Sequence, residues 1–373
     1  MSAPSYSPGL EGVVAGETAI ADLSTGLTYR GYAAETLAEN ATYEEVAYLV
    51  MKGELPNADQ LRDFSVALAT AAHIPDEVVK ILGHLPPASD MMDVLRTAVS
   101  LLGHWDPESG VNTPEANERK AIRLIAQTPV ALAARYRQQK QLPPVPGDPK
   151  LGFAGRVLQM IHGDTPPPDH AKAMDVSLIL YAEHGFNAST FTARVCCSTL
   201  SDMHSAATAA IGALKGPLHG GANERALEVL LKVQSPDRAE SWIRDALARK
   251  ERIMGFGHRV YKDGDPRAVI LQGWCSKLAA STGGEPYEKI AAIIEKEVLE
   301  QKRLKPNVDW PCARLYHYLG LPEAIYTPLF VVGRMVGWCT HISEQLAHNR
   351  LIRPEAIYTG PANRDWVPLA KRK

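Results

Sequence analysis

Helical periodicity extends over residues 42–346 with no convincing strand among them, and this feature restricts the chain to a helical fold. Thr42-Tyr-Glu-Glu45 matches a capping box and is followed by apolar residues at helical spacing. Asn57 is expected to cap a second helix, Pro75 to lie in the first turn of a third, and Ser89 to start a fourth. We therefore predict an all-α architecture.

Residues 12–30, which precede this helical region, contain two short β-prone runs separated by the turn Ser24-Thr-Gly26 and predict a small N-terminal β-hairpin. Farther along, Pro129 is expected to bend or divide the segment 116–140. Residues 169–214 carry few charges and predict two or three consecutive helices that are covered on most sides, in a core or at a subunit interface.

The composition argues against two classes of function. Forty Lys and Arg residues stand against 42 Asp and Glu, a formal net charge of −2, which gives no general electrostatic attraction to nucleic acid or to an anionic membrane. No apolar run approaches the ~20 residues of a membrane span, and residues 1–8 lack the features of a secretory signal. We expect a soluble protein that is not exported.

The five cysteines are odd in number and include no Cys-x-x-Cys pair. Such a set is typical of reduced thiols, most of them buried, and predicts a cytoplasmic setting. The chain of 373 residues is long for a single hydrophobic core. Two domains, or one large domain with a smaller companion, are therefore expected.

The stretch Gly255–Arg267 gathers one histidine and several cations among residues that break regular structure. Its three glycines permit backbone angles closed to other residues, and Pro266 suits the first turn of a helix. His258 is therefore expected on a tight loop and Arg267 near a helix start. The pattern predicts a loop that holds an anion, and the alternative is a solvated basic loop between helices.

Three further segments combine Gly, His, Asn or Asp in unusual local settings: Glu183–Asn187, Gly216–Asn223 and Lys305–Asp309. His219 is expected at a helix N-terminus, where the positive end of the helix dipole disfavours protonation of the imidazole. A neutral imidazole there would be a hydrogen-bond donor. His219 taken alone favours a structural role. The other residues in equally unusual settings, including His258, favour a catalytic role for it.

Two histidines and an aspartate in such loops could also ligate a metal ion. The sequence contains no His-x-His, His-x-x-x-His or Cys/His spacing, and cations surround His258. We therefore predict an organic acid–base site and no metal.

Basic residues near expected helix starts are candidate anion ligands. Arg267, Arg334 and Arg353 are candidates for planar carboxylates, and Lys262, Lys302, Arg303 and Lys305 are candidates for phosphates. A solvated surface role is the alternative for each of them. That alternative is weakest for Arg334, because it lies inside the apolar run Phe330–Trp338 and a buried arginine requires an anion.

The segments Gly216–Asn223, Gly255–Arg267 and Asn307–Asp309 resemble, in this order, motifs of the citrate synthase family. The resemblance extends from about Gly9 to Pro361. It implies an almost wholly α-helical fold, an obligate homodimer, and no cofactor, since coenzyme A enters as a thioester substrate.

The resemblance also implies two domains. Residues 1–219 and 321–373 would form a large helical domain with the dimer contacts and the oxaloacetate site, and residues 220–320 a small helical domain with the CoA side and the catalytic aspartate. Closure of the two domains would exclude water until condensation is complete. The sequence lacks an extension before Leu10-Glu-Gly12, which argues against the NADH regulation of larger bacterial members.

The implied activity is the condensation of acetyl-CoA with oxaloacetate and the hydrolysis of citryl-CoA to citrate and CoA, where carbon enters the tricarboxylic acid cycle. Asp309 would remove a proton from the acetyl methyl group, and His219 would donate a hydrogen bond to the thioester oxygen. His258 would polarise the keto group of oxaloacetate and protonate the new alkoxide. A weakly acidic methyl group requires this arrangement, because a carboxylate base succeeds only if charge forming on the thioester oxygen meets a preorganised donor.

The remaining site residues follow from the same resemblance. The oxaloacetate ligands implied are His184, Asn187, Arg267, Phe330, Arg334 and, from the other subunit, Arg353. The CoA ligands implied are Arg259, Lys262, Lys302, Arg303 and Lys305.

The closest alternative is a 2-methylcitrate synthase, which uses propionyl-CoA by the same mechanism. The segment Ala182–Arg194 resembles both activities, and one methylene of pocket space discriminates only roughly 10- to 200-fold, so dual activity is compatible with the sequence. Two alternatives come from other classes: a helical scaffold that binds an anion without catalysis, and a metal-dependent hydrolase.

Overall fold

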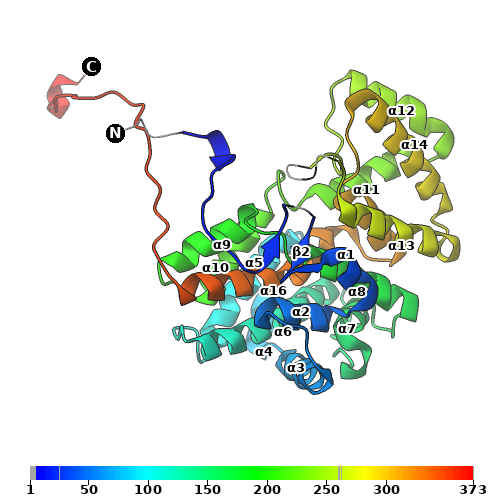
Figure 1. Cartoon of the computed structure of the whole chain (residues 1–373), viewed down its shortest axis with the longest axis horizontal. Helices are drawn as coiled ribbons and strands as arrows, with labels where there is room; N and C mark the ends of the chain where they lie inside the picture. The colour runs from blue at the N-terminus through cyan, green and yellow to red at the C-terminus, as the bar shows by residue number, and fades with distance from the viewer. Residues whose placement is uncertain (1–5, 25, 259–260, 262, 373) are drawn as a thin grey trace.

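The computed structural model describes residues 6–24, 26–258, 261 and 263–372. Helices make up most of this part of the chain, and the all-α prediction is confirmed (Figure 1). The helices of the N-terminal half are α1 (Ala34–Asn40), α2 (Tyr43–Lys52), α3 (Ala58–Ala71), α4 (Asp76–Gly83), α5 (Met91–Trp105), α6 (Pro114–Gln139), α7 (Gly152–His162) and α8 (Pro168–Tyr181). Those of the C-terminal half are α9 (Ala188–Ser198), α10 (Met203–Leu214), α11 (Ala222–Val233), α12 (Pro236–Ala248), α13 (Pro266–Thr282), α14 (Glu285–Lys302), α15 (Asp309–Tyr318) and α16 (Tyr326–Ala347).

The predicted hairpin is present and has a third strand that the sequence did not reveal. Strands β1 (Ala21–Asp22), β2 (Thr28–Tyr29) and β3 (Tyr32–Ala33) form an antiparallel sheet in that order. The buried phenol of Tyr29 donates a 3.0 Å hydrogen bond to the carbonyl oxygen of Ile179. This bond fixes the sheet to the end of α8, directly beside the segment with the predicted site residues.

Several helix starts agree with the sequence and two differ from it. Thr42 and Asn57 each form a complete capping box, as predicted. Pro75 precedes its helix as the N-cap instead of lying in the first turn. Asp90 is the cap of α5, accepting a 2.8 Å hydrogen bond from the Met92 amide, because its carboxylate reaches the free N–H groups that Ser89 does not.

Helix α6 is not divided at Pro129. It packs against α3, α5, α7 and α16, so burial of its faces outweighs the loss of one helical hydrogen bond. The prediction of two or three consecutive helices in residues 169–214 is confirmed by α8, α9 and α10.

Helix α16 is the centre of the fold (Figure 1), and every residue of it from Tyr326 to Ile342 is buried. It packs against α8 through two glycines. A Cβ atom at Gly337 would lie closer than 3.0 Å to the Ala182 carbonyl oxygen, and one at Gly333 would lie 3.1 Å from the Leu178 carbonyl oxygen. These glycines allow the two helices to meet backbone to backbone.

Helices α11 to α14 gather on one side of the molecule, to the upper right in Figure 1. Helix α15 packs against α11 and α13, and both α13 and α15 also contact α8. The domain boundaries at residues 219/220 and 320/321 stay a prediction.

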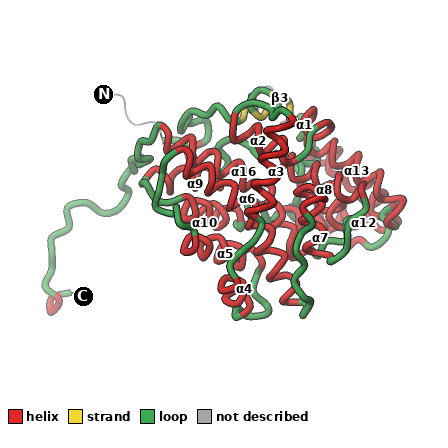
Figure 2. Tube along the Cα trace, turned by 90° about the horizontal axis from the view of Figure 1, so that it is seen from below, coloured by secondary structure: helices red, strands yellow, loops and turns green. Residues whose placement is uncertain are grey.

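Residues 348–368 contain no helix or strand and extend away from the body of the molecule, as the tube in Figure 2 makes clear.

Among the described residues, no helix combines the length and the hydropathy that a membrane span requires. All five cysteines are free, and all except the half-buried Cys196 are buried.

Candidate active site

Five parts of the chain meet at the candidate site. They are the end of α8 with the turn into α9, the turn before α11, the described residues of segment 255–265 with the start of α13, the start of α15, and the middle of α16. Aromatic contacts connect them: the His184 and His258 rings lie 5.2 Å apart, and Phe330 lies between Tyr181 at 4.2 Å and His219 at 6.3 Å.

A short backbone pairing holds the His258 loop beside Asp309. Phe256 and Pro306 form an antiparallel bridge, in which the Gly257 amide donates to Lys305 and the Asn307 amide donates to Gly255, both at 2.9 Å. The Asn307 side chain adds two bonds: its amide group donates to the Gly257 carbonyl, and its oxygen accepts from the Asp309 amide. The two segments, far apart in sequence, therefore form one unit.

Asp309 is the first residue of α15, and its carboxylate accepts a 3.0 Å hydrogen bond from the phenol of Tyr181 at Oδ1. Burial raises the pKa of Asp309 to about 6, although the Tyr181 hydroxyl and the nearby Arg267 and Arg334 oppose this rise. A carboxylate with this pKa is ionised at neutral pH yet basic enough to accept a proton from a weak carbon acid.

His219 lies in a turn that precedes α11, whose N-cap is Gly221. Its Nε2 lies 3.3 Å from the Ser189 amide, which can only donate, so Nε2 accepts and the imidazole proton is on Nδ1. Burial, with a smaller effect of Arg334, lowers the pKa of His219 to about 4. The neutral imidazole expected from the sequence is thus found, but burial is its main cause, and not the helix dipole.

His258 has the opposite tautomer to His219. The Tyr261 amide donates a 3.1 Å hydrogen bond to His258 Nδ1, and the two rings stack 4.6 Å apart. In the neutral imidazole the proton is therefore on Nε2. The Tyr261 hydroxyl lies 3.1 Å from His184 Nε2, so one tyrosine orients two histidines.

Two buried arginines give this site its positive charge. Arg267, the second residue of α13, is 4% exposed and forms a bidentate pair with Asp265 at 2.8 and 2.9 Å. Arg334 of α16 is 1% exposed and donates from Nε to the Tyr181 carbonyl oxygen at 2.6 Å. Burial lowers the pKa of Arg334, and the charge of Arg267 lowers it further.

No carboxylate of the described residues forms an ion pair with Arg334 within 4.0 Å. The nearest acid that acts on its charge is Glu183, whose Oε1 is 2.9 Å from His341 Nε2. His184 adds no positive charge, because burial and the two arginines hold its pKa well below the usual range. The site therefore presents neutral donors and an incompletely balanced pair of guanidinium groups, an arrangement that favours an anion with carboxylates.

Asn187 and Phe330 have mainly architectural contacts in this structure. Asn187 is the N-cap of α9; its side-chain oxygen accepts from the Thr190 amide and lies 2.8 Å from the Ser189 hydroxyl oxygen. Phe330 lies under Arg334, whose guanidinium carbon is 4.9 Å from the ring centre.

The five predicted CoA ligands and Arg353, which is predicted to bind oxaloacetate across the dimer, divide into three groups. Lys302, Arg303 and Lys305 are exposed at the end of α14 and after it, and Lys305 Nζ donates to the Asp263 carbonyl oxygen at 2.7 Å. Arg259 and Lys262 lie outside the described residues. Arg353 is exposed in the extended segment after α16 and is not brought to the site within one chain.

No group of three or more His, Cys, Asp or Glu side chains among the described residues has the arrangement of a metal site. The carboxylate of Asp309 and the two imidazoles of His219 and His258 instead have their own separate hydrogen-bond partners. The geometry is suited to proton transfer and hydrogen bonding.

Comparison with known proteins decides the family. The sequence profile described as "Citrate synthase, C-terminal domain" matches residues 9–355. The chain belongs to the citrate synthase family. It is 46% identical to citrate synthase 2 of Bacillus subtilis and 44% identical to a 2-methylcitrate synthase of Shewanella oneidensis, each over 370 residues, and these alignments cover 98% of this chain and 98% and 97% of the relatives.

A solved structure shares the fold over nearly the whole chain. The ternary complex of citrate synthase from Thermoplasma acidophilum with carboxymethyl coenzyme A and oxaloacetate superimposes with a TM-score of 0.92 at 35% identity, covering 99% of this chain and 100% of that one. Membership of the citrate synthase family makes this protein an acyltransferase-type condensing enzyme. Relatives with both names occur at nearly equal identity, so the family does not separate acetyl-CoA from propionyl-CoA.

Three residues of this citrate synthase site were not predicted. Tyr181 contacts Asp309, Ser189 contacts His219, and Tyr261 contacts two histidines. Tyr181 and Ser189 flank the segment Glu183–Asn187, and Tyr261 lies inside Gly255–Arg267. Their positions next to predicted segments were the available signal, but only the folded chain identifies their partners.

Proposed function

We propose that this protein condenses acetyl-CoA with oxaloacetate and hydrolyses the resulting citryl-CoA to citrate and CoA. The arrangement that carries the proposal is a carboxylate with a pKa of about 6, Asp309, in one site with the neutral imidazole of His219 and the buried charges of Arg267 and Arg334. A base, a neutral donor and a receptor for carboxylates are the three requirements of this condensation.

In the first step the Asp309 carboxylate takes a proton from the methyl group of acetyl-CoA. The electron pair of the C–H bond moves toward the thioester oxygen, which accepts a hydrogen bond from His219 Nδ1–H. A donor fixed in place before the reaction stabilises this developing charge without reorganisation of solvent. The hydrogen bond from Ser189 to Nε2 keeps the proton of His219 on the nitrogen that the step requires.

In the second step the enol or enolate carbon attacks the ketone carbon of oxaloacetate and forms the new C–C bond. His258 donates its Nε2 proton to the ketone oxygen, which becomes the hydroxyl group of citryl-CoA. Water then adds to the thioester carbon, CoA leaves as the thiol, and citrate is the second product. The Tyr261 amide at His258 Nδ1 supports the required tautomer.

Oxaloacetate would be held by its two carboxylates. Arg334 has the terminal guanidinium nitrogens available for a planar carboxylate, and Arg267 is oriented by Asp265. His184, close to both and neutral, would donate a hydrogen bond, with Phe330 packed beneath. Asn187 would act mainly by shaping this turn.

The acyl-CoA would approach from the side of α14 and α15. Lys302, Arg303 and Lys305 are exposed there and would meet phosphates, together with Arg259 and Lys262 of the adjacent loop. Coenzyme A is a substrate in this scheme, and the proposed reaction uses no cofactor or metal ion. The solved relative from Thermoplasma acidophilum, crystallised with a CoA analogue and oxaloacetate, supports this pair of substrates.

We further propose a homodimer in which Arg353 reaches the oxaloacetate site of the other subunit. The extended, exposed segment that contains Arg353 supports this assignment. Mixing Arg353→Ala chains with Asp309→Asn chains should restore activity in heterodimers, each with one intact site. If mixed dimers form, as seen by native mass spectrometry, but none is active, the assignment of Arg353 is wrong.

Domain closure would accompany catalysis, with residues 220–320 moving against the rest of the chain. Small-angle scattering should give a smaller radius of gyration with oxaloacetate and a CoA analogue than without them, and an unchanged profile contradicts closure.

The free and mostly buried cysteines support a cytoplasmic setting.

The decisive measurement is thiol release with oxaloacetate and either acyl-CoA. We expect kcat/KM to favour acetyl-CoA, and Asp309→Asn to lower kcat by about 10²- to 10⁴-fold while CoA binding remains. A clear preference for propionyl-CoA would make the protein a 2-methylcitrate synthase. No thiol release by the unmodified protein, with anion binding intact in Asp309→Asn, would favour the anion-binding scaffold. Activity that a chelator abolishes and a divalent ion restores would favour the hydrolase.

A further inference from the structure

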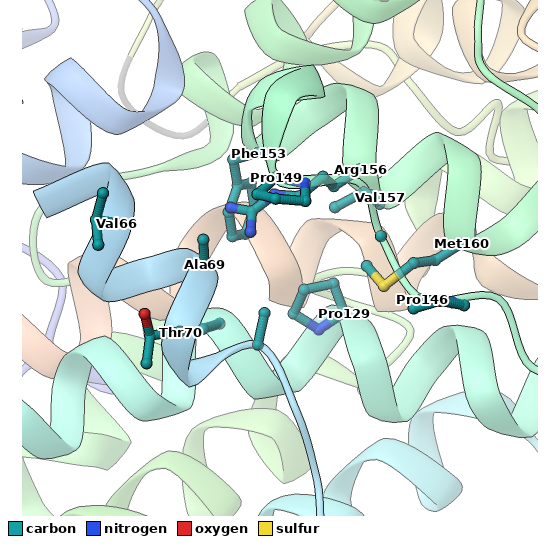
Figure 3. Close-up of a pocket in the computed structure, with 13 residues that line it drawn as sticks. Val66, Ala69, Thr70, Pro129, Pro146, Pro149, Phe153, Arg156, Val157 and Met160 are labelled. Atoms are coloured by element: carbon teal, nitrogen blue, oxygen red, sulfur yellow. The ribbon is translucent and has the colours of Figure 1, made fainter. Parts of the chain in front are cut away.

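A pocket away from the candidate active site lies between α3, α6, α7 and the segment 146–149, with a volume of ≈ 400 Å³ (Figure 3). None of the residues that line it belongs to the active site. Its lining is mainly aliphatic and aromatic and includes Val66, Ala69, Pro129, Phe153, Val157 and Met160. The volume falls within the range of pockets that bind small molecules.

One cation lies in this apolar wall. Arg156 of α7 is 6% exposed, and its Nε donates a 3.3 Å hydrogen bond to the Gly152 carbonyl oxygen. Its guanidinium carbon lies 6.0 Å from the centre of the Phe153 ring, and Figure 3 draws both residues on the same side of the pocket. The acid that acts on its charge is Glu44, whose Oε1 already accepts a 2.6 Å hydrogen bond from the Phe153 amide. Arg156 forms no ion pair within 4.0 Å with any described residue.

The buried arginines of the described chain allow a comparison. Five of them donate from a terminal guanidinium nitrogen to a carboxylate or carbonyl oxygen: Arg135, Arg137, Arg194, Arg267 and Arg314. The two that donate to described residues only through Nε are Arg334 and Arg156. Arg334 is the arginine to which a substrate carboxylate is assigned above. Arg156 has the same bonding pattern in a different, more apolar cavity.

We propose that this pocket binds a monocarboxylate with an apolar body, such as a medium-chain aliphatic acid. The terminal nitrogens of Arg156 donate to the two carboxylate oxygens, since a guanidinium that forms no ion pair is matched best by a planar, bidentate anion. The aliphatic chain packs against the side chains of α3, α6 and α7. This ligand satisfies both properties of the cavity, its single charge and its apolar wall.

Calorimetric titration of the full chain with octanoate tests this inference, with octanol and octylamine as probes of the same length. Octanoate should bind about tenfold or more tightly than octanol, because it gains a charge-assisted pair, and octylamine should bind least. Each methylene removed from the acid should weaken binding by about fourfold. Equal affinity for octanoate and octanol, or no octanoate binding at millimolar concentration, overturns the proposal.

Two variants locate the site. Arg156→Met, which keeps the length of the side chain and removes its charge, should lose the preference for octanoate over octanol. Ala69→Phe should fill the pocket and abolish binding of both, and it decides the matter if Arg156→Met does not fold. Arg62→Met on the exposed face of α3 is the matched control and should bind octanoate like the unmodified protein. Unchanged octanoate binding by Arg156→Met, or by Ala69→Phe, contradicts the inference.

Discussion

The phenol of Tyr181 donates a 3.0 Å hydrogen bond to Oδ1 of Asp309, and this bond connects the last residue of α8 to the first residue of α15. It stabilises the ionised carboxylate against the effect of burial, which raises the pKa of Asp309 to about 6. It also engages one carboxylate oxygen and leaves the other for the acyl group. Tyr181 is thus a positioning residue for the proposed base.

Tyr181→Phe should move the acidic limb of the pH profile of kcat/KM upward by about one unit. Loss of a hydrogen bond to a charged group is worth about 1.5 kcal/mol or more, and 1.36 kcal/mol corresponds to one pKa unit. Activity in the unmodified protein rises as the pH rises through about 6, where Asp309 loses its proton. Tyr316→Phe, which removes a buried hydroxyl near Ser177, is the control and should leave that limb in place. An unshifted limb in Tyr181→Phe would show that the bond does not tune the base.

Asp309→Asn should stabilise the fold while it removes activity. The pKa of Asp309 is about 6 in the folded chain against an ordinary value of 3.8, so its ionised form opposes folding by on the order of 3 kcal/mol above pH 6. This effect should shrink as the pH falls from 6 toward 4, because the folded state then binds the proton. Urea unfolding of both proteins at pH 8 and pH 4.5 measures the difference.

Asp265→Asn is the matched variant, and it should change the stability of the fold in the opposite direction. Burial opposes the charge of Asp265, but its pair with Arg267 and the Val308 amide lower its pKa overall. Its stabilising contribution is therefore present above its unfolded pKa and is lost as the pH falls. Destabilisation at pH 8 by Asp265→Asn, with stabilisation by Asp309→Asn, would separate the structural carboxylate from the proposed base. The same sign for both variants would contradict the assignment.

Ser189→Ala should lower kcat by about threefold to tenfold with little change in the KM for oxaloacetate. Its hydroxyl lies 2.8 Å from His219 Nε2, and a neutral hydrogen bond is worth about 1 kcal/mol. The backbone amide of residue 189 remains, so the effect should be moderate. Ser177→Ala removes a buried hydroxyl that bonds Met174 and serves as the control. A raised KM for oxaloacetate, with kcat unchanged, would place Ser189 in binding instead of catalysis.

Arg334→Met should raise the KM for oxaloacetate by about 100-fold or more and change the KM for acetyl-CoA much less. Removal of one partner of a buried charge pair costs about 2–5 kcal/mol. Arg135→Met provides the comparison, since Arg135 is equally buried but bonds the carbonyl oxygens of Leu85 and Pro86. Equal effects of the two variants on steady-state constants would indicate a general loss of structure.

Gly337→Ala should destabilise the protein by about 1–3 kcal/mol, because the added methyl group would overlap the Ala182 carbonyl oxygen. Gly273→Ala on α13 has no atom within 4 Å of its added methyl group and should stabilise by about 0.5–1 kcal/mol. Thermal unfolding of both variants provides the measurement. A neutral Gly337→Ala would mean that α16 can move away from α8 without cost.

Much of the fold was predictable because it depends on local patterns. The capping boxes at Thr42 and Asn57 use side chains within three residues of the helix start, and such signals are present in the sequence itself. Pro129 was misleading because its effect on a helix depends on what packs around it, and α6 is packed on several sides. The third strand, Tyr32–Ala33, leads directly into α1 at Ala34, so no turn signal marks its end in the sequence.

The site residues likewise divide into those that the local sequence reveals and those that depend on the folded chain. His219, His258 and Asp309 lie in motifs with unusual local composition, so they could be selected from the sequence. Tyr181 and Ser189 lie in ordinary helical surroundings, and their importance comes from partners 128 and 30 residues away. The cause of the low pKa of His219 was likewise not readable, because burial is a property of the whole fold.

The contact of α16 with α8 through Gly333 and Gly337 also bears on how acyl specificity can diverge among relatives. Two helices that touch through their backbones cannot move closer together to reshape the space beside them. With Asp309 as the proposed base, room for a larger acyl group would come from exchanging the side chains near it, such as Tyr181 and Phe330. A few side-chain substitutions, with the packing of α8 on α16 unchanged, would then be enough to convert an acetyl-CoA enzyme into a propionyl-CoA enzyme.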